Sequence, residues 1–155
     1  MLQPSWYLPD VDWFAQLRTA PCLGDDSRAV IAQLERMLRV EPSFGAATTV
    51  TATHAMLLAV EHLSDAMAYA AGSHDLIEMA RLLCGLNLVT AHLAQTVQRI
   101  AGHVTDRAFP GLTSASDDAV HALVDNLSTA GAAGEILAGH LKEAHLTLRN
   151  LTAQP

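Results

Sequence analysis

The sequence predicts an all-α protein, an antiparallel up-and-down bundle of four main helices plus a short N-terminal helix and arm. Apolar residues recur at three-and-four spacing, as in a helix. No stretch long enough for a β-strand alternates between apolar and polar residues. Pro and Gly divide the chain into long helical segments joined by short connections, which favours antiparallel neighbours. Two windows, residues 42–60 and 82–98, contain no Asp, Glu, Lys or Arg.

The first half of the chain is expected to hold three helices. Residues 1–9 form an arm, and Asp10 caps a short helix that ends at Ala20-Pro21. Asp25 or Asp26 caps a second helix that runs through residue 40, and a turn follows over residues 41–45. A third helix starts between residues 46 and 49 and runs to residue 71, before Gly72.

The second half is expected to hold two long helices. One spans residues 74–108, on the order of 50 Å at about 1.5 Å per residue, and ends at Phe109-Pro110-Gly111. Ser114 or Ser116 caps the last helix, which continues to about residue 151. Gly131 and Gly134 lie at its centre, where they predict either a break or a close contact with another helix.

The length predicts a single domain. Residues 1–24 make the arm and short helix, and residues 25–155 make the helical bundle. A chain of this size can bury roughly 70% of its unfolded surface, so it needs no disulfide or metal to fold. Cys22 and Cys84 are therefore expected to be reduced thiols, with Cys84 in the core.

Two polar residues fall on apolar helix faces. His145 projects beside leucines of the last helix, and Asn87 projects among small and apolar residues of the fourth. A buried polar group without a partner costs roughly 1–3 kcal/mol. These residues are either hydrogen-bonded core groups that fix helix register or polar anchors in a ligand pocket.

The histidines raise the question of a metal. No pair of ligands stands at i and i+3 or i and i+4 in a known metal motif. His54 and Glu61 are seven residues apart, about 10 Å along a helix, so they cannot chelate one ion by themselves. A site assembled from several helices, with His54, Glu61 and His145 as candidates, stays open, but no cofactor is predicted.

Aromatic residues gather in the arm. Four of the seven aromatics lie in the first fourteen positions, namely Trp6, Tyr7, Trp13 and Phe14. Tryptophan and tyrosine are enriched at interfaces. The arm either folds back on its own bundle or packs on a second subunit, in which case these four residues form the interface.

Charge and composition restrict the partners. The net charge is −7 and no basic cluster exists, which disfavours nucleic acid and anionic membranes. Polar residues interrupt both charge-free windows, so neither is expected to span a membrane. The N-terminus has no basic, apolar leader, and a cytoplasmic location is expected.

No residue pattern indicates a catalytic nucleophile or a phosphate-binding loop. We therefore expect a non-catalytic protein that acts through protein–protein interaction, as a homodimer or with another protein. The reason is that the charge-free turns of the third and fourth helices present more apolar surface than one bundle can cover. The alternative is a small-molecule- or metal-binding bundle, possibly an enzyme, in which His, Glu and Asn side chains converge between helices.

Overall fold

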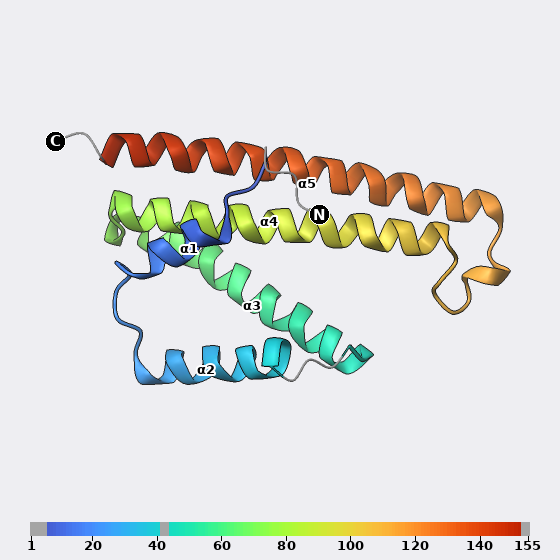
Figure 1. The fold of residues 1–155 in the computed structure, drawn as a ribbon, viewed down its shortest axis with the longest axis horizontal. Coiled ribbons are helices and arrows are strands. Elements are labelled where there is room, and N and C mark those ends of the chain that lie inside the picture. Colours follow the sequence, from blue (N-terminus) through green and yellow to red (C-terminus); the bar gives the residue numbers. More distant parts are fainter. Residues whose placement is uncertain (1–5, 41–43, 153–155) are drawn as a thin grey trace. The chain divides into compact units, whose positions relative to one another are not determined.

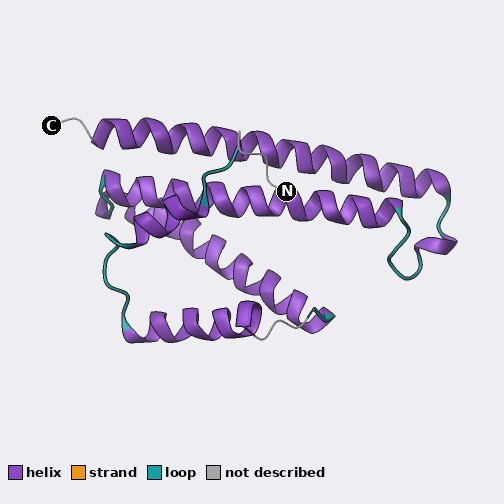
Figure 2. Cartoon of the chain, viewed as in Figure 1, coloured by secondary structure: helices purple, strands orange, loops and turns teal. Residues whose placement is uncertain are grey.

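The computed structural model describes residues 6–40 and 44–152, and all regular structure in them is helical (Figure 2). Its five α-helices are α1 (Asp10–Leu17), α2 (Asp25–Glu35), α3 (Ala46–Ala70), α4 (Leu76–Thr105) and α5 (Asp117–Thr152). A π-helical turn, Arg36–Val40, extends α2, and short 3-10 turns follow α3 and precede α5. The all-α class predicted from the sequence is confirmed.

The chain divides into two compact units. Unit 1 contains the arm, α1, α4 and α5, and unit 2 contains α2 and α3 within residues 20–75. The boundaries of these units differ from the boundary at residue 24 that was expected from the sequence. The single domain over residues 25–155 stays a prediction.

Unit 1 is built around the α4–α5 hairpin, whose helices run side by side along their length (Figure 1). The facing surfaces are lined with small residues. Those buried are Ala80, Cys84, Ala91, Ala94 and Ala101 of α4 and Gly131 and Ala138 of α5. Small side chains allow the two helix axes to approach closely, which increases the dispersion contacts between them.

Gly131 and Gly134 lie where α5 contacts Gln98 and Ala94 of α4 closely. A Cβ on Gly134 would stand 2.9 Å from Ala94 Cβ, and one on Gly131 would stand 2.8 Å from Gln98 Cγ. The helix α5 is continuous through both glycines. The structure therefore favours the predicted close contact over the predicted break.

The loop between α4 and α5 is organised by Arg107. This residue has a left-handed φ of 52°, and its guanidinium donates to the carbonyl oxygens of Leu112 (2.5 Å) and Ala115 (3.0 Å). It also pairs with Asp117 at the start of α5. Ser116 Oγ accepts from the backbone N–H of Ala119 at 3.3 Å, as expected of an N-cap residue.

Other predicted helix caps are wrong by one position. Pro9 and Gly24 occupy the N-cap positions, while Asp10 and Asp25 are the first helical residues. Their carboxylates still lie in the first turn, where the positive end of the helix dipole favours them.

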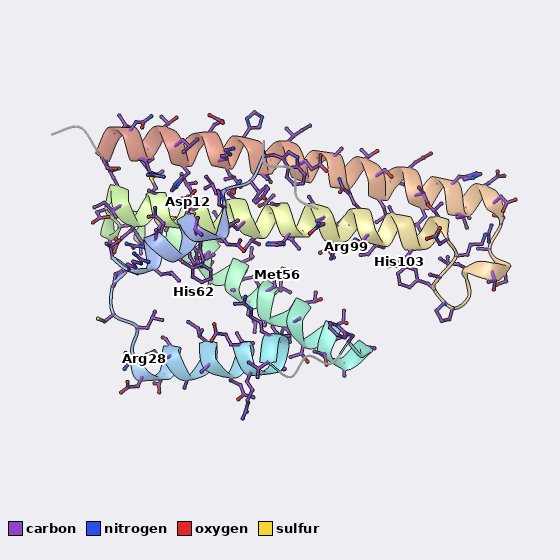
Figure 3. All side chains as sticks on the ribbon, viewed as in Figure 1. Asp12, Arg28, Met56, His62, Arg99 and His103 are labelled. Carbon is purple, nitrogen blue, oxygen red and sulfur yellow. The ribbon has the colours of Figure 1, made fainter. Side chains whose placement is uncertain are left out.

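Unit 2 has no enclosed core. None of its described residues is buried, although α3 contains long apolar side chains on most of its circumference. Its internal interactions are local, such as the ion pair between Arg28 and Asp25 one turn away (Arg28 is labelled in Figure 3).

Candidate functional site

Asn87 on α4 is the main polar group in the interior of unit 1. Its side chain is fully buried. The amide oxygen accepts from the backbone N–H of Leu8 at 2.8 Å. The amide nitrogen donates to the carbonyl oxygens of Trp6 (3.1 Å) and Ala138 (2.6 Å). One side chain thus joins the arm to both helices of the hairpin, and all its bonds go to backbone groups.

His145 on α5 is the second buried polar group. Its Nδ1 lies 2.8 Å from the carbonyl oxygen of Ala80, and the ring is completely inaccessible. Because a carbonyl oxygen only accepts, Nδ1 donates its proton to it. Among the described residues, Nε2 is buried without a hydrogen-bond partner.

Cys84 lies one helical turn after Ala80 on α4. Burial in the apolar interior raises the pKa of its thiol to about 11, and the carboxylate of Asp12 on α1 adds to this rise while Arg149 opposes it (Asp12 is labelled in Figure 3). The thiol is therefore protonated at neutral pH. Since the thiolate is the nucleophile and metal ligand, Cys84 is a core residue here, as the sequence predicted.

Two of the three proposed metal ligands lie on α3 in unit 2. The side chains of His54 and Glu61 are exposed there, while His145 is buried in unit 1. Across residues 6–40 and 44–152, no three His, Cys, Asp or Glu side chains gather in a way that could hold a metal ion. The expectation that no cofactor is bound stays a prediction.

The aromatic arm packs on its own chain. A Cβ on Gly85 of α4 would meet the Trp13 ring at 3.1 Å, so the ring lies directly on the helix backbone. Leu8 between the aromatics is only 2% exposed. Trp6 and Tyr7 are half-buried, and Phe14 is exposed. A role for these four aromatics in contacting a second subunit stays a prediction.

Arg81 of α4 connects this helix to α1 through hydrogen bonds that the sequence did not predict. Its guanidinium donates to the carbonyl oxygens of Gln16 (3.2 Å) and Thr19 (3.1 Å). These carbonyls lie at the C-terminal end of α1, where a cation is favourable. No local pattern could reveal this contact, because the partners lie more than 60 residues away along the chain.

In unit 2, α3 carries several exposed apolar side chains. Val50, Leu57, Leu58 and Val60 are exposed, and they lie on both sides of the stripe that carries His54 and Glu61. Val50 is 67% exposed, and Leu57 is 53% exposed. Met56 and His62, labelled in Figure 3, come from the same helix. No Asp, Glu, Lys or Arg lies between residues 46 and 60.

One helix of the described chain, α4, is long and apolar enough that a membrane span is compatible with its length and composition. Core helices of soluble proteins meet the same criterion, so this is weak evidence for a span. Within unit 1, α4 packs against α5 and α1.

No protein-family model, curated protein or solved structure matches this chain.

Proposed function

We propose that this chain is a non-catalytic, cytoplasmic helical protein that acts through protein–protein interaction as a homodimer. The observation that carries this proposal is the contrast inside unit 2. Its longest helix is apolar around most of its circumference, yet the unit buries none of its described residues. A helix with so wide an apolar surface normally packs into an interior, and exposed apolar surface of this kind marks interaction sites.

The polar interior of unit 1 supports a structural role. The amide of Asn87 forms hydrogen bonds with three backbone groups. Burial keeps the thiol of Cys84 protonated. Neither group is left free to bind a substrate or to attack one. The net charge of −7 disfavours nucleic acid or an anionic membrane as the partner.

We further propose that the four long helices form one antiparallel bundle in the assembled protein. A short connection over residues 71–75 joins α3 to α4. Connections of this length favour antiparallel neighbours in helical bundles. In such a bundle one side of α3 is covered by its own chain, and the opposite side remains for a partner.

The direct test is the molar mass of the full chain in solution. Light scattering at micromolar concentration should give twice the protomer mass of 16.5 kDa. The unfolding midpoint should also rise with protein concentration, because dissociation accompanies unfolding of a dimer. A monomer across the micromolar range contradicts the homodimer.

The second candidate is a small-molecule- or metal-binding bundle, and the specific observation in its favour is the unpaired Nε2 of His145. An imidazole nitrogen with a free lone pair is a metal ligand. Metal analysis of protein purified without a His-tag separates the two candidates. A stoichiometric metal that is lost in His145→Gln would favour binding, whereas a metal content well below one per chain favours the interaction protein.

A further inference from the structure

Residues 6–19, which comprise the described part of the arm and α1, form a segment that we call the strap. The strap belongs to unit 1, but the chain that leads from it to α4 runs through all of unit 2. Within unit 1, α1 lies against α4 (Figure 1). The strap is therefore held on the hairpin by non-covalent contacts alone, in the way that a bound peptide is held.

The side chain of Asn87 binds the main chain of the strap. Its amide oxygen accepts from the N–H of Leu8 at 2.8 Å, and its amide nitrogen donates to the carbonyl oxygen of Trp6 at 3.1 Å. Peptide recognition commonly combines main-chain hydrogen bonds with a pocket for a side chain. The side chain that fills this role is Leu8, the only buried residue among residues 6–19.

Two further residues of α4 fit the C-terminal part of the strap. A Cβ at Gly85 would lie 3.1 Å from the ring of Trp13, so the absence of a side chain allows the indole to lie on the helix. The guanidinium of Arg81 donates to the carbonyl oxygens of Gln16 and Thr19 at 3.2 and 3.1 Å. These acceptors are again main-chain groups. This side of α4 thus accommodates a segment through its backbone, one leucine and one tryptophan.

Most of the seam between α4 and α5 does not involve the strap. Beyond Asn87 the seam continues with buried Ala94, Ala101 and Val104 on α4 and Val120 on α5. The helix α1, by contrast, has no buried residue and is only eight residues long. Isolated helices shorter than about 12–15 residues are marginal in water. The strap is therefore expected to open at a lower free energy than the hairpin.

We infer that the hairpin is a docking site for residues 6–19 and that the strap is its releasable ligand, bound in cis. The hairpin stays folded when the strap leaves, and the vacated site accepts the same segment supplied as a separate peptide. On release, the amide of Asn87 keeps its bond to the carbonyl oxygen of Ala138 at 2.6 Å, and water replaces its two partners on the strap. This inference does not depend on the homodimer proposed above.

The test uses the full chain with Leu8→Glu. A carboxylate is strongly disfavoured at a position that is only 2% exposed, so the altered strap should leave the site. A fluorescently labelled peptide with the wild-type sequence of residues 6–19 should then bind to the variant. By fluorescence anisotropy its affinity should exceed that for the wild-type chain by about tenfold or more, because the wild-type strap competes at a high effective concentration.

A matched control on the chain and one on the peptide make this result specific. Val11→Glu adds the same charge to the strap at a side chain that is 70% exposed, so this variant should bind the peptide no better than the wild type does. A peptide that is N-methylated at Leu8 lacks the donor for the amide oxygen of Asn87. Its affinity for the Leu8→Glu chain should be lower by about tenfold, the effect of one lost hydrogen bond.

A second measurement uses the wild-type chain without a peptide. The N–H of Leu8 is bonded to Asn87, so its hydrogen exchange reports release of the strap. Its protection factor, measured by NMR, should be lower by about tenfold or more than that of Ala91 in the core of α4. Equal protection would mean that the strap leaves only when the hairpin unfolds, which overturns the inference.

Three results of the peptide experiment also overturn it. The first is a Leu8→Glu chain that loses its cooperative unfolding transition, because the hairpin then requires the strap. The second is a Leu8→Glu chain that binds the peptide no better than the wild type does. The third is undiminished binding of the N-methylated peptide, because Asn87 then does not recognise the main chain.

Discussion

The α4–α5 hairpin and the α2–α3 unit each contain a long apolar helix, α4 and α3, but among the described residues only the hairpin encloses a core. In the hairpin, glycine and alanine line the seam, and the two backbones approach closely at Gly134 and Ala94. In unit 2 several large residues of α3 are exposed, and none of the described residues is buried. Apolar composition therefore favours burial of a helix against something else. Small residues at facing positions determine which helices pack on each other.

The largest expected effect in this comparison comes from Asn87. Replacing it with Ala leaves the Leu8 N–H and two carbonyl oxygens without their buried partner. At roughly 1–3 kcal/mol for an unsatisfied buried group, we expect a loss of about 3 kcal/mol in the free energy of unfolding, measured by urea denaturation.

The matched control is Asn126→Ala on the same hairpin. Asn126 is exposed, and its amide bonds only the carbonyl oxygen of Ala122 one turn earlier, so its loss should cost less than about 0.5 kcal/mol. Equal effects at the two positions would show that the hairpin does not depend on its buried amide.

Two glycine-to-alanine substitutions test the close approach of α4 and α5. Their expected effects on stability are smaller and have opposite signs. Gly134→Ala places a Cβ within 3.4 Å of the Ala94 Cα, which cannot move without the helix. We expect a net destabilisation of about 1–2 kcal/mol, because overpacking outweighs the better helix propensity of alanine.

Gly102→Ala is the corresponding control on α4. Nothing lies within 4 Å of a Cβ at that position. The substitution should therefore stabilise the protein by up to about 1 kcal/mol through helix propensity alone. Thermal unfolding midpoints of both variants give the signs, and a stabilised Gly134→Ala protein would contradict the tight seam.

The smallest effect compares one thiol from each unit. Cys22 is exposed and Cys84 is buried. With a pKa of about 11 against a reference value of 9.0, Cys84 forms about a hundredfold less thiolate at neutral pH. A chromogenic disulfide should react quickly with Cys22 and slowly with Cys84. Cys22→Ser should abolish the fast phase, and a fast phase that survives this change would contradict the buried state of Cys84.

The same pKa predicts a loss of stability in alkali. The folded state holds the proton of Cys84 more tightly than the unfolded state does, so the unfolded state binds fewer protons above pH 9. The contribution of the protonated Cys84 thiol to the free energy of unfolding is complete below about pH 9 and is lost as the pH rises towards 11. Cys84→Ala should flatten this part of the stability profile.

The sequence predicted the helices well because their signals are local. Ser116, for example, was one of two predicted caps for α5 and makes the capping bond. Helical periodicity also placed Asn87 and His145 on apolar faces, and both are fully buried. The partners of Asn87 could not be predicted, since they lie between 51 and 81 residues away and depend on how the arm returns to the hairpin.

The central glycines of α5 show where local reasoning ends. Propensity alone permitted a break or a close contact at Gly131 and Gly134. The choice was decided by Ala94 and Gln98 on another helix, which are invisible to a window that contains only the glycines. The same limit applies to Arg81, whose acceptors belong to α1.

The bond between Leu8 and Asn87 has a consequence for the order in which the chain assembles. The arm is made before the hairpin, but Asn87 also needs the carbonyl of Ala138 to complete its bonds. Translation at 5–20 residues per second separates Leu8 from Ala138 by on the order of ten seconds. During that interval Trp6 and Trp13 have no finished hairpin to pack on. The arm, although synthesised before α4 and α5, therefore takes its place in unit 1 only after both helices are complete.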